Sequence, residues 1–389
     1  MKRIVIVGGG YGGLACLRAA ARRFRGTATE LLLLDATPYH TLKTRFHERA
    51  VRAERERGLR FRLAPLAAAS GARFVQDEVV EVDSGRRRVV GAEGEYPYDA
   101  VVLGLGGRTV YFGVPGAEEH TVSLQTYEAA DRAARRVRAL GLGRRAGPHR
   151  RVVVCGAGIE GLEVAAMLRR LAPPRRCAID VVEMGPDVMA RSRCSDAQRR
   201  YLRAYLERKE IGLRLRTRIR EVGPQGVLLD PGGEVPADLV YWCSGVRRET
   251  LGAEDPEGPF TVDRRLRRPD HPEVFALGDF ATVDSPEPYA NLGSAQRAVC
   301  HGGLVGENLW RLARGRPLRP VRYRPAGEIV GLGDTDGVGS LYGVPLRGIA
   351  AAMAKKAIEA RYLGELFGGV PGAARRCLPG WARQGRAGL

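Results

Sequence analysis

Two glycine-rich loops of one pattern are the segments of this chain best suited to binding phosphate groups. Each loop has the spacing Gly-x-Gly-x-x-Gly after a short apolar run, and an acidic residue comes 22 residues after its last glycine. The glycines and acidic residues are Gly8, Gly10, Gly13 and Asp35 in the first copy, and Gly156, Gly158, Gly161 and Glu183 in the second. The two copies begin 148 residues apart.

The chemistry of this pattern is the binding of a dinucleotide. The first glycine makes the turn from strand to helix, the second lets the backbone approach a pyrophosphate, and the third lets the helix pack on the strand. The pyrophosphate lies at the positive end of the helix, and the acidic residue accepts hydrogen bonds from an adenosine ribose. Because two copies occur in register, the sequence predicts two dinucleotides bound at once, which is typical of an electron-transfer enzyme.

Each loop must be held by a unit of strand, loop, helix and strand. Residues 1–35 fit one such unit and residues 152–183 fit the second. A buried strand that ends in a glycine turn follows each unit, at 98–104 and at 239–245, so the duplication extends beyond the loops. The sequence therefore predicts an α/β fold with two Rossmann-like, doubly wound dinucleotide-binding domains.

Segments outside these units are expected to add smaller elements. Alternating apolar and polar residues at 73–90 predict antiparallel strands, and the spacing of apolar residues predicts a helix over about 348–367. The last twenty residues are basic and rich in glycine, so we expect them to be loosely ordered.

Length and composition indicate a globular protein. With 389 residues, of which 44% are hydrophobic, the chain can form two or three domains with cores of their own. We identify no secretory signal peptide and no uncharged apolar run long enough to span a membrane. The seven cysteines form no C-x-x-C pair and no metal-binding spacing, which indicates reduced thiols in a cytosolic setting and no metal site.

The formal net charge of +19 comes almost entirely from arginine. Two explanations remain open: a solvated surface of dispersed arginines, or attraction to an anionic partner such as phospholipid, nucleic acid or an acidic redox protein. Because the arginines are dispersed and aromatic residues make up only 6% of the chain, the sequence does not favour nucleic-acid binding.

Four sequence stretches occur in a characteristic order: GGGYGG, YDAVVLGLGG, GAGIEGLEVA and FALGDFA. In this order the chain resembles the flavoproteins with two dinucleotide folds that are related to pyridine-nucleotide disulfide reductases. Within that group it is most similar to type II NADH dehydrogenases, the single-chain NADH:quinone oxidoreductases. Residues 38–50, 111–120 and 331–363 support this narrower resemblance, and the last segment stands where disulfide reductases carry a dimerisation domain.

The resemblance implies FAD on the first loop, NADH on the second, and electron transfer to a membrane quinone without proton pumping. It also implies a C-terminal region that faces the membrane, in a cytoplasmic enzyme held peripherally on the anionic inner face of the cell membrane. A homodimer is one expected assembly. The implied division is a first FAD-binding part (1–112), an NADH-binding domain (113–247), a second FAD-binding part (248–326) and a quinone- and membrane-associated region (327–389).

The resemblance gives roles to four further residues. Asp279 would bind the ribityl or pyrophosphate region of the flavin, although an aspartate there also fits a helix N-cap. Glu163 would orient the nicotinamide or relay a proton at the flavin, or would simply be an anion favoured by the helix dipole. Gln296 would bind a quinone carbonyl, or would lie exposed at a helix start. Lys356 would line a quinone channel, or would extend towards lipid phosphate.

Three local features refine the predicted reaction. Glu183 would bind ribose hydroxyls and repel a 2′-phosphate, which favours NADH over NADPH. Family members often carry glutamines where this chain has Cys300 and His301, and His301 is expected at the surface rather than as a proton donor to quinone. Residues 36–76 contain no cysteine, so the reduced flavin must pass its electrons outwards and not to a protein disulfide.

Three other functions fit part of the sequence. A soluble reductase of an acidic ferredoxin or rubredoxin would suit the positive charge, but residues 331–367 argue against it. A flavoprotein that binds nucleic acid would need a clustered basic stripe with interleaved aromatic residues. A sulfide:quinone reductase is a weaker alternative because its cysteines would flank the flavin.

Overall fold

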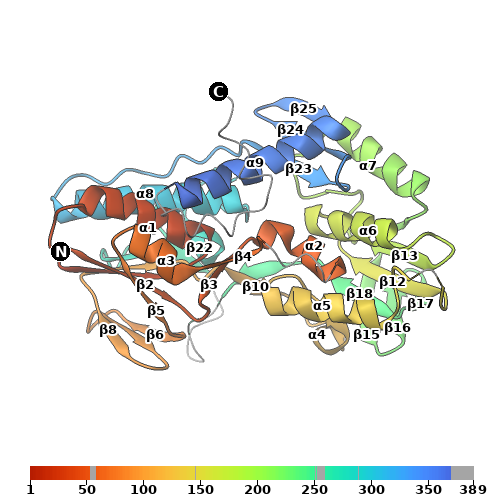
Figure 1. The fold of residues 1–389 in the computed structure, drawn as a ribbon, viewed down its shortest axis with the longest axis horizontal. Helices are drawn as coiled ribbons and strands as arrows, with labels where there is room; N and C mark the ends of the chain where they lie inside the picture. Colours follow the sequence, from red (N-terminus) through yellow and green to blue (C-terminus); the bar gives the residue numbers. More distant parts are fainter. Residues whose placement is uncertain (53–57, 145, 250, 252–258, 288, 369–389) are drawn as a thin grey trace.

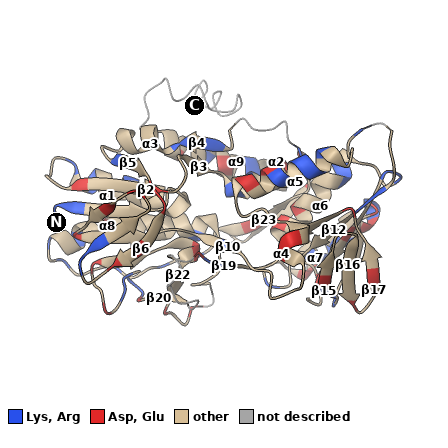
Figure 2. Cartoon of the chain, turned by 90° about the horizontal axis from the view of Figure 1, so that it is seen from below, with Lys and Arg blue, Asp and Glu red and all other residues tan. Residues whose placement is uncertain are grey.

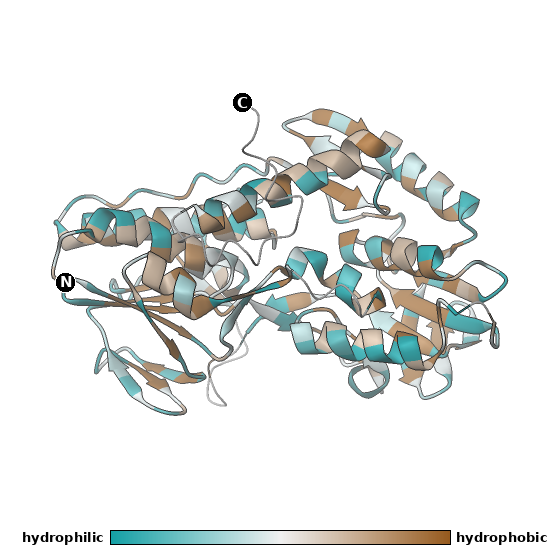
Figure 3. Cartoon of the chain, viewed as in Figure 1, coloured by the Kyte–Doolittle hydropathy of each residue, from teal (hydrophilic) through white to brown (hydrophobic). Residues whose placement is uncertain are grey.

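The computed structural model describes residues 1–52, 58–144, 146–249, 251, 259–287 and 289–368 (Figure 1). Two parallel sheets with their helices lie at opposite ends of an elongated molecule, and α9 (Ile349–Phe367) runs along one side of it. Hydrophobic residues gather on the strands of both sheets, whereas hydrophilic residues are spread over the helices (Figure 3). The prediction for the last twenty residues, which include one of the seven cysteines, lies outside the described residues.

The first sheet has five parallel strands, with the strand that precedes the first glycine loop at its centre. In spatial order they are β21 (Val274–Ala276), β9 (Ala100–Leu103), β1 (Arg3–Val7), β2 (Glu30–Asp35) and β5 (Arg73–Gln76). The central strands are apolar and buried, as expected where helices cover both faces. The helix after the loop, α1 (Tyr11–Phe24), packs against α8 (Ala295–Ala313).

The second sheet repeats this order around the second loop. Its strands are β11 (Thr121–Val122), β18 (Leu239–Trp242), β12 (Arg150–Cys155), β13 (Cys177–Val182) and β14 (Gly212–Arg214), all parallel. Its helices are α6 (Ile159–Leu171), α5 (Tyr127–Ala139), which Thr126 caps, and α7 (Asp196–Arg208), which begins with a capping box at Ser195. The predicted α/β fold with two doubly wound sheets is confirmed.

Small sheets and short helices complete the two units. Antiparallel strands are β3 (Tyr39–Thr41) with β4 (Arg60–Arg62), β6 (Val79–Asp83) with β7 (Arg88–Gly91) and β8 (Glu95–Pro97), β15 (Arg218–Gly223) with β16 (Gly226–Asp230) and β17 (Gly233–Pro236), and β10 (Gly107–Thr109) with β19 (Val246–Arg248). The others are the parallel pair β20 (Phe260–Val262) and β22 (Ala281–Val283), helices α2 (Phe46–Val51), α3 (Leu63–Ala69) and α4 (Ala117–His120), and 3₁₀ turns η1 (Lys43–Arg45) and η2 (Gly278–Phe280).

The prediction of antiparallel strands throughout 73–90 is partly wrong. Strands β6 and β7 do form an antiparallel pair, but β5 joins the first parallel sheet as its edge strand. All four residues of this edge strand are at least partly exposed, so the segment lacks the buried apolar run that marks the central parallel strands.

Two segments connect the units. Helix α2 follows the first unit's strands in sequence but packs against α5 and α6 of the second unit, with Phe46 and Ala50 in that unit's core. Strand β10, which follows β9, pairs with β19, which follows β18. Chain segments from the first unit therefore reach the loop of the second.

The C-terminal region consists of a three-stranded antiparallel sheet and the predicted helix, which is confirmed as α9. The strands are β23 (Gly327–Gly331), β24 (Gly337–Leu341) and β25 (Val344–Arg347). Helix α9 starts against this sheet and ends with Leu363, Leu366 and Phe367 in the core of the first unit. None of the helices in the described part of the chain combines the length and apolar composition needed to cross a membrane.

Candidate active site

The two glycine loops have the same backbone geometry. Gly8 and Gly156 have φ angles of +100° and +101°, a region that L side chains rarely adopt. The amide of Gly8 donates to the Leu34 carbonyl and that of Gly156 to the Val182 carbonyl, each at 2.8 Å. Each loop is thus fixed to the neighbouring strand before its helix begins.

The other glycines keep two different spaces free. A Cβ atom at Gly13 would collide with the Gly8 carbonyl oxygen, and one at Gly161 would collide with the Gly156 carbonyl oxygen. The helices can therefore approach the strands this closely only because these two positions carry no side chain. A Cβ atom at Gly10 or at the corresponding Gly158 would meet nothing within 4 Å. This open space lies at each helix N-terminus, where a pyrophosphate fits.

Asp35 ends β2 and braces the first loop. Its Oδ2 accepts from the Gly9 amide at 2.7 Å, and its Oδ1 accepts from the Thr37 amide at 2.7 Å. Burial raises the pKa of Asp35, while the bonds from Gly9 and Thr37 lower it. Each carboxylate oxygen can accept more than one bond, so Asp35 can also bind a ribose hydroxyl.

Glu183 directly follows β13 and has the equivalent contacts in the second loop. Its Oε2 accepts from the Ala157 amide at 2.9 Å, and its Oε1 accepts from the Gly185 amide at 2.6 Å. The carboxylate is therefore held in one orientation beside the loop, as Asp35 is in the first unit. A second ribose can be bound there in the same way.

Asp279 lies in η2, directly after β21, and is held by a buried arginine. Its Oδ1 is 3.5 Å from Nη2 of Arg297, and the Arg297 guanidinium donates to the carbonyls of Gly278 and Ala290 at 2.8 Å. Arg297 was not among the predicted site residues.

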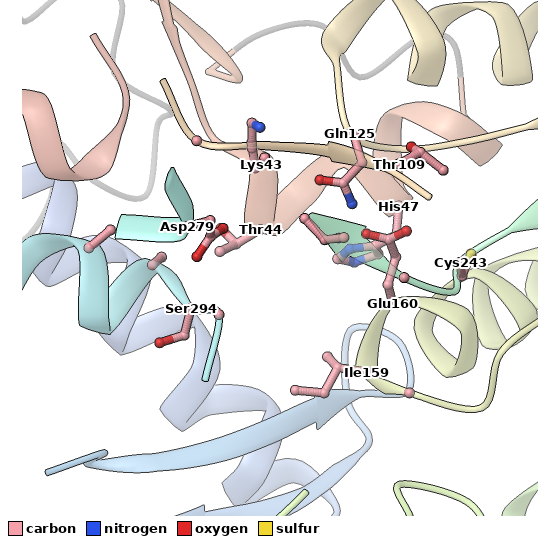
Figure 4. Close-up of a pocket in the computed structure, with 18 of the residues that line it drawn as sticks. Lys43, Thr44, His47, Thr109, Gln125, Ile159, Glu160, Cys243, Asp279 and Ser294 are labelled. Carbon is pink, nitrogen blue, oxygen red and sulfur yellow. The ribbon is translucent and has the colours of Figure 1, made fainter. Parts of the chain in front are cut away.

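Both loops open into one cavity of about 2820 Å³. The predicted site residues that line it are Gly8, Gly10, Asp35, Gly156, Gly158, Glu163, Glu183, Asp279 and Gln296. A drug-sized ligand fills a pocket of roughly 300–1,000 Å³, so this cavity has room for several ligands side by side. Side chains from both units surround it (Figure 4).

Glu163 lies in α6 and is 2% exposed. Its Oε1 accepts a hydrogen bond from Lys355 Nζ and another, of 2.7 Å, from the Gly331 amide. Its Oε2 is 3.1 Å from Nδ1 of His47. This carboxylate therefore connects α6 to the C-terminal region and to α2, which an anion stabilised only by the helix dipole would not do.

The family model of pyridine nucleotide-disulphide oxidoreductases matches residues 2–302. The chain belongs to this family. Two curated relatives extend the similarity to almost the whole chain. The type II NADH:quinone oxidoreductase of Staphylococcus epidermidis is 26% identical, with 94% of this chain and 96% of that protein covered. The demethylphylloquinone reductase NdbB of Synechocystis is 29% identical, with 92% and 91% covered.

The predicted resemblance to type II NADH dehydrogenases is confirmed by these relatives. Among solved structures, the sulfide:quinone oxidoreductase of Aquifex aeolicus has a TM-score of 0.80 with 19% identity, covering 97% of this chain and 94% of that one. At that identity the likeness concerns the fold alone.

Gln296 of this pyridine nucleotide-disulphide oxidoreductase lies in the first turn of α8 and lines the cavity. Its amide group is engaged on both sides, since Nε2 donates to the Gly327 carbonyl at 3.0 Å and Oε1 accepts from the Ala326 amide at 3.1 Å. Gln296 thus attaches the C-terminal sheet to α8. Its predicted bond to a quinone stays a prediction.

The structure places Lys356 outside the cavity and the adjacent Lys355 on its wall. The exposed Lys356 donates to the Asp334 carbonyl at 3.0 Å. The spacing of apolar residues fails as a guide to Lys356 because α9 packs on different neighbours at its two ends. Ile349 and Met353, at its start, are exposed, whereas Leu363, near its end, is fully buried.

The expectation that His301 lies at the surface is wrong. His301 is completely buried in α8, does not line the cavity, and burial lowers its pKa to about 3. The reason is that α8 packs closely against α1, so this face of the helix belongs to the core. Cys300 does line the cavity, and burial raises the pKa of its thiol.

Sequence reasoning also missed Lys43, His47 and Glu160 among the ionisable residues of the cavity wall. Lys43 and His47 come from the 38–50 segment, which was recognised as a block and not residue by residue, and Glu160 precedes the last glycine of the second loop. Burial lowers the pKa of Lys43 and raises that of Glu160 to about 7. The sequence held one signal that could have found them: all three are charged or titratable side chains in segments already assigned to the nucleotide-binding site.

Neither a metal centre nor a disulfide is formed by the residues that the structure describes. No group of three or more His, Cys, Asp or Glu side chains there is arranged to hold a metal ion. The cysteines of that part of the chain are free thiols, and Cys155 and Cys243 line the cavity.

Proposed function

We propose that this protein is an FAD-dependent enzyme that transfers electrons from NADH to a membrane quinone without pumping protons. The observation that carries the proposal is the pair of matching nucleotide loops that open into one cavity. The chain division into 1–112, 113–247, 248–326 and 327–389 is part of the same proposal. It is supported by β21, which brings the third segment into the sheet of the first.

The first loop suits FAD. Gly10 leaves room for a pyrophosphate, Asp35 can bind the ribose, and Asp279 lies across the cavity near the flavin's ribityl chain in this assignment. The chemistry that a bound flavin supplies is the acceptance of a hydride and the release of two electrons. The protein would hold the two nucleotides in one cavity, so that the transfer is in effect unimolecular.

The second loop suits NADH. Glu183 is held by the Ala157 and Gly185 amides and has lone pairs left for the two hydroxyls of an adenosine ribose. Its negative charge would repel the phosphate that distinguishes NADPH. Glu163 lies one helical turn further along α6, where a nicotinamide would meet the flavin.

The cavity thiols do not favour a disulfide or sulfide reaction. The reactive form of cysteine is the thiolate. Burial raises the pKa of Cys155 to about 12 and holds that of Cys243 well above its usual value, so both stay protonated. Because these thiols stay protonated, they support direct electron transfer to a quinone better than electron transfer through a cysteine sulfur.

An exposed apolar patch on the C-terminal region suits a membrane surface. Tyr342, Val344, Ile349 and Met353 are each more than half exposed, and Tyr342 also lines the cavity. A patch of this kind marks a membrane or protein contact. We propose that it rests on the anionic inner face of the cell membrane, where quinone enters, and that a second copy of the chain is the alternative occupant.

Anaerobic reaction of the purified flavoprotein with NADH or NADPH, followed by a soluble quinone analogue, tests the proposal. We expect NADH to reduce the flavin much faster than NADPH, and the quinone to reoxidise it at once. A ferredoxin-type protein serves as the competing acceptor. Reoxidation by that protein and not by quinone would reject the proposal in favour of a soluble reductase.

A further inference from the structure

Three ionisable side chains from distant parts of the chain form a continuous line of contacts on the cavity wall. Lys355 in α9 pairs with Oε1 of Glu163 in α6, and Oε2 of Glu163 is 3.1 Å from Nδ1 of His47 in α2. The side chains of Lys355, His47 and Glu163 are 27%, 11% and 3% exposed. The carboxylate is the buried centre of the line, and Figure 4 shows His47 among the side chains around the cavity.

Glu163 determines which nitrogen of His47 carries the proton when the ring is neutral. An ionised carboxylate only accepts hydrogen bonds, so a neutral imidazole facing it carries its proton on Nδ1. Its Nε2 then has a free lone pair. A carboxylate placed in this way holds the ring in one tautomer and stabilises the imidazolium that forms when Nε2 takes up a proton.

The same surroundings make that imidazolium more acidic than the imidazolium of a free histidine. Burial has the largest effect and lowers the pKa of His47 below its usual value. Glu163 raises this pKa, and the Lys355 ammonium lowers it. A proton taken up at Nε2 is therefore readily given away.

Other charged groups lie around His47, and several of them form ion pairs. Within its own segment Glu48 raises and Arg45 lowers the pKa of His47. Arg45 pairs with Glu48 at 2.8 Å and with Glu359 of α9 at 3.0 Å. On the α5 side, Asp131 pairs with Arg49 of α2. On the α6 side, Glu160 also lines the cavity.

We propose that His47 is the general acid that donates a proton to the quinone oxygen, with Glu163 and Lys355 as its positioning residues. The inference rests on the proposed function, because quinone reduction is the step that consumes a proton from solvent.

The overall reaction is NADH + H⁺ + quinone → NAD⁺ + quinol, in which NADH is oxidised and the quinone reduced by two electrons. One of the quinol's two protons originates in the hydride, and His47 supplies the other. In that step the Nε2–H bond breaks, an O–H bond forms, and the imidazolium becomes neutral imidazole. Water in the cavity then returns a proton from bulk solvent to Nε2.

The variant His47→Asn tests the role of Nε2. The asparagine amide can still donate to Glu163, but it has no atom that can carry the proton of Nε2. In stopped-flow experiments between pH 5.5 and 9, we expect reduction by NADH to be unchanged. Reoxidation by a soluble quinone at pH 6 should be about 100-fold slower, a typical loss for a general acid.

The pH profile of reoxidation separates a proton donor from a merely structural residue. Because the imidazolium is the donor, the wild-type rate should fall as pH rises above the pKa of His47 and level off below it. Lys355→Met removes a positive charge and should move the break to higher pH, by about one unit. Glu163→Gln removes a negative charge and should move it to lower pH, whereas loss of structure would not produce opposite shifts.

Nitrogen NMR of ¹⁵N-histidine-labelled holoprotein gives a readout independent of any acceptor. The signal of His47 is identified by its absence in His47→Asn, and His271→Asn on the surface is the matched control for activity. We expect the Nδ1-protonated tautomer at pH 7 and a higher titration midpoint in Lys355→Met.

These experiments distinguish a failure of the proposed function from a failure of the general-acid assignment. If quinone does not reoxidise the wild-type flavin, the proposed function is wrong, whatever the state of His47. If quinone turnover is fast but His47→Asn keeps the wild-type rate and pH profile, the general-acid assignment is overturned. An Nε2-protonated tautomer, or a midpoint that Lys355→Met leaves in place, would overturn it as well.

Discussion

Asp35 and Glu183 show how one carboxylate at the end of a strand can have two tasks. Each accepts a bond from a backbone amide of its glycine loop and another from the residue two positions after it. These bonds fix the loop and orient the oxygens that face the nucleotide. The charge of such a residue therefore decides which ribose the loop accepts.

We predict that Glu183→Gln changes the choice of nucleotide more than the fold. The glutamine keeps one acceptor oxygen for the loop but loses the charge that repels a 2′-phosphate. A hydrogen bond to a charged group contributes about 1.5–3 kcal/mol, so kcat/KM for NADH should fall at least about tenfold, while that for NADPH rises. Steady-state kinetics with both nucleotides checks this, and exposed Glu207→Gln on α7 is the control. Equal losses with both nucleotides would contradict the prediction.

At the scale of elements, the loop, strand and helix of each unit act together because the helix can approach the strand only at glycine. The last glycine of the loop touches the carbonyl oxygen of the first, whereas the middle glycine faces open space. Within one loop, the last glycine therefore affects stability, whereas the middle glycine, three positions before it, affects ligand binding.

Gly161→Ala and Gly158→Ala form a matched pair that tests this separation. The added methyl group at position 161 would collide with the Gly156 carbonyl oxygen, so we expect a loss of about 1–3 kcal/mol in the free energy of unfolding. At position 158 φ is −78°, which alanine tolerates, so stability should stay within about 0.5 kcal/mol. NADH binding should nevertheless weaken, because the methyl group occupies the space of the pyrophosphate. Thermal unfolding and NADH titration measure the two effects, and equal melting temperatures for the two variants would contradict the argument.

The elements also show why the sequence predicted the loops but not the whole site. The glycine pattern is local, and its geometry follows from a few consecutive residues, so Gly8 and Gly156 could be placed correctly. The contact of His47 with Glu163 depends on α2 crossing to the second unit, which no local pattern reveals. To place Lys355 and not Lys356 on the cavity wall, the rotation of α9 about its axis must be known to within one residue, and the sequence does not give that rotation.

At the scale of the molecule, α9 joins parts that the sequence keeps separate. It begins on the C-terminal sheet, contacts Glu163 of the second unit through Lys355, and ends in the core of the first unit. In the described part of the chain, basic residues are spread over both units and do not gather in one stripe (Figure 2). Attraction to an anionic membrane therefore depends on the basic residues that lie beside the apolar patch of the C-terminal region.

We predict that the apolar patch, defined by Tyr342, Val344, Ile349 and Met353, carries membrane binding separately from catalysis. Exposed Arg347, Lys356 and Arg361 lie in the same region and suit anionic lipid headgroups. The double variant Ile349→Asp with Met353→Asp adds two charges to a surface that is already exposed, so folding and turnover with a soluble quinone should be unchanged. Its binding to vesicles that contain anionic lipid should fall by at least about tenfold, since burial of each such side chain contributes about 1.5–3 kcal/mol.

Co-sedimentation with vesicles measures this, and Leu228→Asp in β16 is the control, because Leu228 is exposed but lies in the meander of the second unit. Turnover with a quinone dissolved in the vesicles should fall in parallel with binding, because the patch adjoins the cavity at Tyr342. If the double variant instead converts a dimer to a monomer and still sediments with vesicles, the patch is the contact between two copies of this chain and the membrane surface lies elsewhere.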